Sequence, residues 1–381
     1  MTDAAFQIDG SWQSRFRPVV EAFANNFVNG DVGASFAVVQ NGELVVDIWG
    51  GHLDAARTQP WQENTIVNVY SSTKTMTFLA ALLLAERGQL DLHAPVAQYW
   101  PEFAANGKAN VKVSHLLAHS AGLSGLEEPI APADVYDWDK ITGLLAAQAP
   151  WWEPGTASGY HAITQGFLLG EVVRRIVGKS FGTFLRDEIT GPLGTDFHVG
   201  VAPEHDARIG FLIPAGAGTV QMPGPPDSIG VRTMRNPAIF ALQSREVGWR
   251  RAEIPAANGH GNARSLALTQ AALVGRGNVD GTALFSAAGA RRALEQQISG
   301  TDLVLGVPMT FGMGYGLRTA ELPISPNPNA AYWGGWGGSI IVIDFDAQLT
   351  FSYVMNQMGE GTLGDVRGMS LGAALYGVLA S

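Results

Sequence analysis

Residues 71–88, SSTKTMTFLAALLLAERG, predict a helix at the centre of the fold. From Met76 to Ala85 the side chains are apolar at every position except one threonine. A helix that is apolar on nearly all sides is buried inside a protein. Gly88 then supplies the residue type with which helices commonly end. We therefore expect a buried helix over 73–87.

Ser71 and Lys74 open this helix and are the first candidates for chemistry. They are three residues apart, so a helix places them on the same face. Lys74 is one of five lysines in the chain, and a buried amine is unfavourable unless it is paired or neutral. A neutral lysine beside a serine hydroxyl can take the hydroxyl proton and create a nucleophile. The alternative is structural: Ser71 caps the helix, and Lys74 extends its amine to solvent.

The composition limits the classes of partner. The chain has 381 residues and a formal net charge of −10, which disfavours nucleic acids and anionic membranes as partners. Cysteine is absent, so disulfides and thiolate metal sites are excluded. The N-terminal residues lack the pattern of a secretory signal, and no apolar run is long enough to cross a bilayer. We expect a soluble, cytoplasmic protein; its oligomeric state stays open.

Strand patterns occur at both ends of the chain, and helix patterns fill the middle. Two β-rich runs, 34–40 and 44–49, flank Asn41-Gly42, a strong signal for a β-hairpin. Residues 212–237, rich in Gly and Pro, predict a long surface loop that serves as a lid or binding element. Further helices are predicted at 12–28, 112–119, 163–177, 181–189, 263–276, 286–298 and 365–380, and further strands at 312–318, 330–344 and 348–355.

This order of elements predicts an α+β fold. Residues 1–72 and 225–381 are expected to form one α/β region around an antiparallel sheet, which is built from both chain ends and flanked by helices. Residues 73–224 are expected to form a mainly helical region inserted between them. Ligand sites commonly lie in clefts between such regions. We therefore expect the active site at the junction, where the apolar helix begins.

Two later segments complete a pattern with residues 71–74. PGTASGYHA at 154–162 leads from a turn into a predicted helix, and YWGGWGGS at 332–339 leads into a predicted strand. In this order the three segments resemble the motifs of the serine β-lactamase and penicillin-binding superfamily. The resemblance is best to family VIII carboxylesterases, which look like class C β-lactamases, and it extends over roughly residues 15–380. It implies the fold of that superfamily.

The resemblance also implies a role for each matched residue. Ser71 would be the acylated nucleophile, Lys74 would take or share its proton, and Tyr160 would relay protons to the leaving group. The backbone N–H groups of Ser71 and Trp336 would form the oxyanion hole. Which of Lys74 and Tyr160 is the base in each half-reaction stays open, because their titrations would be coupled. No cofactor or metal is implied.

Five further residues are candidates for substrate binding. Trp333, Gly334 and Gly335 match the third motif of the family, and His161 and Trp152 lie in or near the tyrosine segment. Each has a structural alternative. The glycines are also typical of a bulged edge strand, and aromatic rings are common in protein cores.

Two departures from the β-lactamase pattern concern the substrate. Ala162 stands where an asparagine is usual, and Trp333 stands where a lysine attracts the substrate carboxylate. Both favour a neutral, apolar acyl ester over an anionic lactam. The resemblance thus implies a serine esterase acting on small short-acyl esters, with water or an alcohol as acyl acceptor and acyl transfer as a side activity. The alternatives are a β-lactamase or D-alanyl-D-alanine peptidase, and a catalytically inactive binding protein of the same fold.

Two other patterns are not expected to form sites. GKSFG at 178–182 and GMSLG at 368–372 match the nucleophile elbow of α/β-hydrolases, which requires a sharp turn from a strand to a helix. The first serine follows a predicted helix, and the second lies within one. His115 and His119 are four apart, but no acidic ligand follows at a metal-site spacing, so we expect no metal there.

Overall fold

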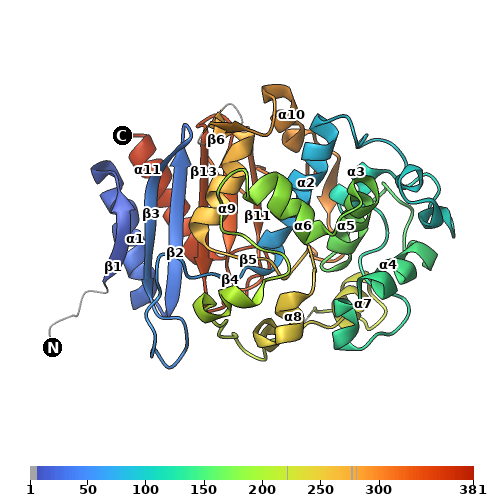
Figure 1. The fold of residues 1–381 in the computed structure, drawn as a ribbon, viewed down its shortest axis with the longest axis horizontal. Helices are drawn as coiled ribbons and strands as arrows, with labels where there is room; N and C mark the ends of the chain where they lie inside the picture. The colour runs from blue at the N-terminus through green and yellow to red at the C-terminus, as the bar shows by residue number, and fades with distance from the viewer. Residues whose placement is uncertain (1–6, 221, 276–277, 280) are drawn as a thin grey trace.

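The computed structural model describes residues 7–381 except 221, 276, 277 and 280. Within these residues, nine strands form one antiparallel sheet in the order β1-β3-β2-β13-β12-β11-β10-β9-β8 (Figure 1). These strands are β1 (Ile8–Trp12), β2 (Gly33–Gln40), β3 (Glu43–Gly51), β8 (Ile298–Thr301), β9 (Pro308–Phe311), β10 (Gly316–Leu317), β11 (Ala330–Gly334), β12 (Ile340–Asp344) and β13 (Leu349–Met355). Two short pairs lie outside the sheet, β4 (Val67–Asn68) with β5 (His260–Gly261) and β6 (Asn278–Val279) with β7 (Thr282–Ala283).

The sheet joins the two ends of the chain. β13 pairs with β2 along its whole length, with Phe351 opposite Val38, and β2 continues through the predicted hairpin into β3. Asn41 and Gly42 both have positive φ, at 53° and 83°, as the tightest hairpin turns require. β2 and β13 are buried on both faces, which is why their sequences are largely apolar without strict alternation. The predicted sheet built from both termini is confirmed.

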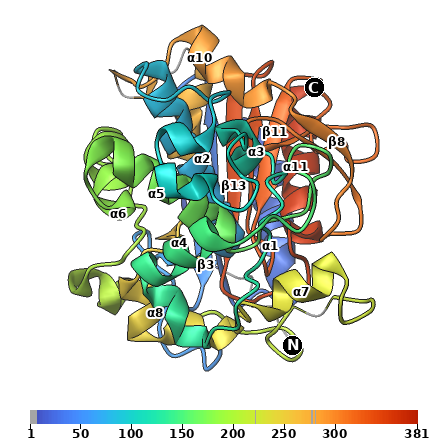
Figure 2. The ribbon, with the colours of Figure 1, turned by 90° about the vertical axis from the view of Figure 1, so that its right-hand side faces the viewer.

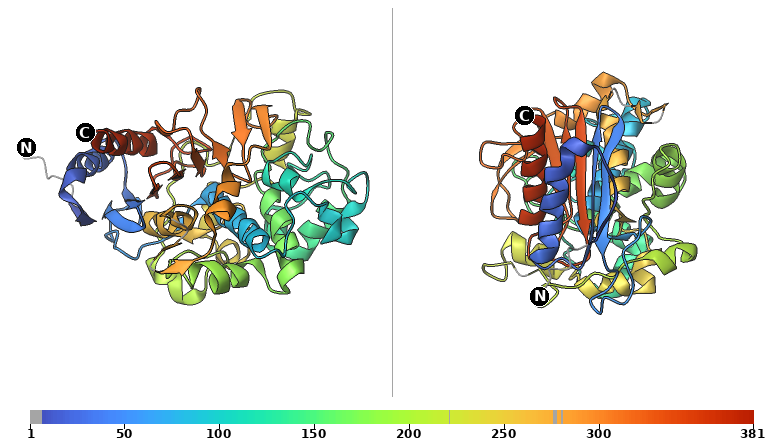
Figure 3. Two further views of the ribbon diagram at one scale, coloured as in Figure 1. Left: turned by 90° about the horizontal axis from the view of Figure 1, so that it is seen from above. Right: turned by 90° about the vertical axis from the view of Figure 1, so that its left-hand side faces the viewer.

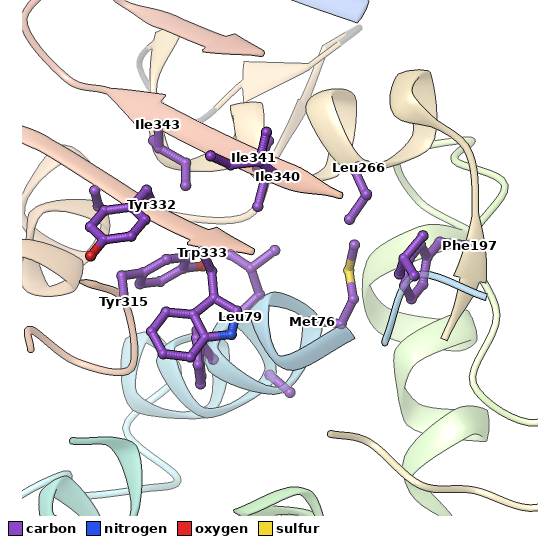
Figure 4. Packing of buried hydrophobic residues seen from close by; sticks show 14 of the residues in the cluster. Met76, Leu79, Phe197, Leu266, Tyr315, Tyr332, Trp333, Ile340, Ile341 and Ile343 are labelled. Carbon is purple, nitrogen blue, oxygen red and sulfur yellow. The ribbon is translucent and has the colours of Figure 1, made fainter. Parts of the chain in front are cut away.

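Helices cover both faces of this sheet. α1 (Arg17–Val28) and α11 (Val366–Leu379) lie side by side on one face (Figure 3). α9 (Ala263–Gln270) packs on β2 and β13 from the other face. Side chains of α2 (Lys74–Glu86), α9, β11 and β12 meet in one apolar core (Figure 4). Every side chain of α2 from Lys74 to Leu84 is buried, so the predicted central helix is confirmed.

Most helices from the middle of the chain lie on the side of the molecule away from β1, and this side faces the viewer in Figure 2. α5 (Thr164–Val177) contacts α2, α3 (Val113–Leu117), α4 (Trp138–Ala147) and α6 (Phe181–Leu185). It ends at Gly178, whose φ of +67° gives the left-handed cap typical of helix ends. The shorter helices are α7 (Ile229–Arg235), α8 (Val247–Arg251) and α10 (Ala287–Arg291). None of the helices in the described part of the chain is both long and apolar enough to span a bilayer.

Several element predictions need correction, among them the strand expected over 312–318, which covers only Gly316–Leu317. The helix expected over 12–28 starts later, because Trp12 pairs with Val46 as the last residue of strand β1. A 3₁₀ turn, η1 (Ser14–Phe16), then leads into α1 at Arg17, with Pro18 in its first turn. The helix expected over 286–298 is shorter: α10 is followed by a 3₁₀ turn, η11 (Arg292–Leu294), and Ile298 already pairs with β9 as the first residue of edge strand β8. The loop expected over 212–237 contains α7.

Candidate active site

Ser71 lies in a 3₁₀ turn, η2 (Tyr70–Thr73), that leads directly into α2. Tyr70, just before it, has a φ of +43°, which is uncommon for a residue other than glycine. Packing holds this strained backbone in place: the Tyr70 ring contacts Trp336 and Trp249, and its hydroxyl donates to the Ala241 carbonyl at 3.1 Å. The sharp bend places the Ser71 hydroxyl at the start of the buried helix.

The Lys74 amine is the centre of a hydrogen-bonded group. Its Nζ lies 3.2 Å from the Ser71 hydroxyl and 2.9 Å from the Tyr160 hydroxyl, and these two hydroxyls are hydrogen-bonded to each other. Nζ also donates to the carbonyls of Ala162 at 2.7 Å and Ala256 at 3.0 Å. The structure therefore brings the three predicted catalytic side chains together, although Tyr160 is 86 residues from Lys74 in the chain.

Burial controls the proton affinity of this group. Lys74 is fully buried, and burial lowers its pKa well below the ordinary value of 10.5. Burial raises the pKa of Tyr160, with the negative charge of Asp302 adding to the rise and the hydrogen bond to Ser71 opposing it. A neutral amine has two protons and one lone pair. With both protons donated to the carbonyls of Ala162 and Ala256, the lone pair is left for the two hydroxyls.

The segment after β11 lies directly against the turn that carries Ser71. A Cβ at Gly335 would be 2.2 Å from the Val69 carbonyl oxygen and 3.3 Å from the Ser71 nitrogen, so only glycine allows this approach. Ser339 Oγ donates to the same Val69 carbonyl at 3.0 Å. Within the described residues, the backbone N–H groups of Ser71 and Trp336 have no hydrogen-bond partner. An oxyanion hole formed by these two donors stays a prediction.

An apolar cavity of about 350 Å³ opens beside Ser71 and Tyr160. Trp336 lines one part of it. Much of the remaining wall comes from α7 and its flanks; these lining residues are Val220, Met222, Val231, Met234, Pro237, Ala238, Ile239 and Phe240. The Gly- and Pro-rich segment, predicted to be a lid or binding element, thus contributes much of the pocket wall, although its lack of periodicity did not show which residues line the pocket. The scattered apolar side chains within it were the available signal.

The five predicted substrate-binding residues do not line this cavity. Trp333 is fully buried, its ring stacks on His119 with centroids 5.6 Å apart, and Figure 4 shows it in the core beside Leu79 of α2. Gly335 instead provides the close approach to the Ser71 turn, and Gly334 provides a close approach to the backbone of Leu363 and Gly364. Their geometry gives them a structural role, and substrate binding by these residues stays a prediction.

His161 and Trp152 brace the tyrosine segment from within. His161 is fully buried; its Nε2 accepts the Leu123 N–H at 3.1 Å, and its Nδ1 lies 2.6 Å from the Gly159 carbonyl. Burial lowers the pKa of His161 to about 3, so the ring is neutral. Trp152 donates its indole N–H to the Ala157 carbonyl at 2.9 Å. Both side chains are occupied by these contacts, and neither lines the cavity.

The rejected motifs keep structural roles. Ser180 caps α6, where its hydroxyl accepts the Thr183 N–H and donates to Glu253. Ser370 lies inside α11 and donates to the Arg367 carbonyl. In the described ranges of the chain, no group of three or more His, Cys, Asp or Glu side chains could hold a metal ion.

Comparisons with known proteins agree with this architecture. Residues 21–375 match the family model described as Beta-lactamase. "Esterase/beta-lactamase LipL" of Mycobacterium tuberculosis (strain ATCC 25618 / H37Rv) is 35% identical over 370 residues, covering 93% of this chain and 84% of the relative. A crystal structure of a family VIII carboxylesterase is 42% identical, with a TM-score of 0.92 and coverage of 98% and 100% of the two chains.

A second solved structure, a penicillin-binding protein homologue from Caulobacter crescentus, is 37% identical with a TM-score of 0.92, and the match covers 98% of this chain and 100% of that one. The predicted fold and the resemblance to family VIII carboxylesterases are both confirmed by these matches. The motif order, the sheet built from both chain ends and the match over residues 21–375 have one explanation. The chain belongs to the beta-lactamase family.

Proposed function

We propose that this protein is a serine carboxylic ester hydrolase that acts on small short-acyl esters through an acyl-enzyme. The observation that carries the proposal is the position of the buried Lys74 amine, 3.2 Å from the Ser71 hydroxyl and 2.9 Å from the Tyr160 hydroxyl. Relatives named as esterases support the same reaction class, including LipL and "Esterase EstB" of Burkholderia gladioli, which is 30% identical over 181 residues.

In the first half-reaction, Ser71 Oγ attacks the ester carbonyl and its proton passes to the Lys74–Tyr160 pair. The carbonyl oxygen becomes negative and accepts hydrogen bonds from the N–H groups of Ser71 and Trp336. A fixed donor of this kind typically lowers the barrier by about 3 kcal/mol. Tyr160, held in its protonated form by burial, then gives a proton to the departing alcohol oxygen.

In the second half-reaction, water attacks the acyl-Ser71 carbonyl and the same pair accepts its proton. Collapse of this intermediate returns the proton to Ser71 Oγ and releases the carboxylic acid. An alcohol that replaces water in this step gives a new ester, so acyl transfer is a natural side activity. An apolar cavity wall favours it, because water competes less well there.

The cavity also supports the substrate class. Its volume of about 350 Å³ and its apolar wall suit a short acyl chain. Neither Ala162 nor the buried Trp333 offers a polar side chain to an anionic lactam.

A direct test compares Ser71→Ala with Ser180→Ala on p-nitrophenyl butyrate. We expect Ser71→Ala to lose at least ~10³-fold in kcat/KM, as for other nucleophile deletions. Ser180→Ala removes the cap of α6, which does not line the cavity, and should keep most activity. Loss of activity in Ser180→Ala with retention in Ser71→Ala would refute the proposal.

A β-lactamase activity is the second candidate, because the printed name of the relative LipL includes it. The same preparations should be tested with nitrocefin. Turnover of nitrocefin at a rate equal to that of p-nitrophenyl butyrate would favour this second candidate. We expect ester hydrolysis to be the faster reaction.

A further inference from the structure

Asp302 is a buried carboxylate that the proposed chemistry does not use directly. It lies in the turn between β8 and β9, the hairpin at the edge of the sheet, and its side chain has no exposed surface. Carboxylates are rarely fully buried unless they are partnered. Its partners therefore indicate why the chain keeps a charged group at this position.

Oδ1 of Asp302 accepts three backbone N–H groups. Two belong to its own turn, from Val304 and Leu305, each at 2.9 Å. The third comes from Tyr160 at 3.0 Å, across 142 residues of sequence. A backbone bond from the Leu303 N–H to the Ser158 carbonyl at 2.8 Å runs beside it. The edge hairpin and the tyrosine segment are thus fixed to one another at the tyrosine itself.

The opposite side of the tyrosine segment is held by His119. Its carbonyl accepts the Gly159 N–H at 2.9 Å, and its Nδ1 accepts the His161 N–H at 3.0 Å. Three consecutive backbone N–H groups, from 159 to 161, are therefore all bound to neighbours outside the segment. The Tyr160 ring also packs between Lys74 and Trp333. The phenol has little freedom to move unless one of these anchors is removed.

We propose that Asp302 is a positioning residue that holds the Tyr160 hydroxyl where it protonates the departing alcohol. The inference rests on the proposed ester hydrolysis. The carboxylate acts through its hydrogen bond to the Tyr160 backbone and does not touch the substrate. Proton transfer by a side chain typically accelerates a reaction 10²–10⁴-fold and requires placement within hydrogen-bond reach of the reacting oxygen. Displacement of the phenol by about 1 Å is enough to lose much of that gain.

The leaving group provides a readout that simple destabilisation does not move. Ethanol must be protonated as it departs from ethyl butyrate, whereas p-nitrophenolate departs as a stable anion. We expect Asp302→Ala to lower kcat for ethyl butyrate at least tenfold more than kcat for p-nitrophenyl butyrate. Asp302→Asn keeps an oxygen that can accept the same N–H groups, so its ratio of the two rates should stay within about threefold of the wild-type ratio.

Asp344 provides a matched control. It is also fully buried and accepts backbone N–H groups in a turn, from Asp346 at 3.1 Å and Ala347 at 2.8 Å, but it belongs to the end of β12. Asp344→Ala should lower the melting temperature without changing the ratio of rates. The inference would be overturned if folded Asp302→Ala kept the wild-type ratio of kcat for ethyl butyrate to kcat for p-nitrophenyl butyrate. It would also be overturned if Asp344→Ala changed this ratio as much as Asp302→Ala does.

A double variant separates this inference from the proposed function. If Asp302 acts through Tyr160, adding Asp302→Ala to Tyr160→Phe should lower kcat for ethyl butyrate no further than Tyr160→Phe alone does. A further tenfold loss in the double variant would contradict the positioning role. Unchanged activity in Tyr160→Phe itself would instead refute the proposed mechanism.

Discussion

Lys74 is the residue on which the proposed chemistry depends most. Its amine is fully buried and donates to the carbonyls of Ala162 and Ala256. Burial favours the neutral form, which is the form that can accept a proton from Ser71. A lysine that was paired with a carboxylate would remain charged and could not act as a base. The burial and the two carbonyl contacts of Lys74 thus explain how a residue of the buried helix can act as a base.

The pH dependence of the rate tests this protonation state. We expect kcat/KM for p-nitrophenyl butyrate to fall as the pH is lowered through the depressed pKa of Lys74, because the amine gains its proton there and ceases to be a base. The activity should already be fully developed well below pH 10.5, the ordinary value. An activity that rises only near pH 10.5 would contradict the account. Lys74→Met should lose at least ~10³-fold at every pH.

The residues of the proton-transfer group could be found from sequence, but those of the pocket could not. Ser71 and Lys74 are neighbours on one helix, so their spacing alone places them together. Trp333 was expected to contact substrate because it occupies a motif position. In the structure it packs on His119 and Phe78, since burying a large ring beside an apolar helix is more favourable than exposing it in a pocket. Asp302 had no signal at all, because its role is visible only as a contact across 142 residues.

At the scale of elements, the turn after β11 decides how closely the sheet approaches Ser71. Gly335→Ala would place a methyl group 2.2 Å from the Val69 carbonyl oxygen and 2.5 Å from Ser339 Oγ, so the strand must move away from the Ser71 N–H. We expect kcat/KM to fall at least ~10²-fold, as when an oxyanion-hole donor is removed. Steady-state kinetics and a melting curve provide the measurement.

Gly377→Ala is the matched control for this substitution. Gly377 lies in α11, and a Cβ there would meet no atom within 4 Å. Alanine in a helix interior is favoured over glycine by roughly 0.5–1 kcal/mol, so this variant should be slightly more stable and fully active. Full activity in Gly335→Ala would show that the close approach is not required.

α7 forms part of the cavity wall, and we expect it to limit the length of the acyl chain. Met234 lines the cavity from this helix, whereas Ile229, at the start of the same helix, does not. We expect Met234→Ala to raise the ratio of kcat/KM for p-nitrophenyl octanoate to that for the butyrate by several-fold, because a shortened side chain leaves room for extra methylenes. Ile229→Ala should leave this ratio unchanged. A ratio that is equally insensitive to both substitutions would place the acyl chain elsewhere.

The elements themselves differ in how well the sequence predicts them. The hairpin at Asn41-Gly42 and the buried helix after Ser71 follow from local rules, because a turn type and a periodicity each point to one structure. Strand β8 does not, since a short segment that can continue a helix is instead fixed by pairing with β9. Tertiary contacts decide such segments, and single-sequence patterns do not contain them.

At the scale of the whole molecule, a buried ionic group ties the two ends of the chain together. Arg367 at the start of α11 pairs with Asp31, which precedes β2, and with Asp365. It also donates to the Gly337 carbonyl at 2.7 Å, in the segment that carries Trp336. The contacts that join the two ends of the chain therefore include the segment of the proposed oxyanion hole.

This group makes a prediction for stability. Arg367→Met leaves the Asp31 carboxylate buried without its cation, and such a loss typically costs about 3–5 kcal/mol in the free energy of unfolding. Arg17→Ala breaks the exposed pair with Glu21 and should change that free energy by less than about 1 kcal/mol. Urea unfolding of both variants is the measurement. A loss in Arg367→Met no larger than that in Arg17→Ala would contradict the role of the buried pair.

The most direct measurement of the central claim is the mass of the intact protein after reaction with a fluorophosphonate, followed by peptide mapping. The account predicts one added phosphonyl group, located on Ser71, and no labelling of the folded Ser71→Ala variant. It also predicts much slower labelling of Lys74→Met, because the hydroxyl then lacks its base. A label on Ser180 or Ser370, or an unlabelled protein that nevertheless hydrolyses p-nitrophenyl butyrate, would contradict it.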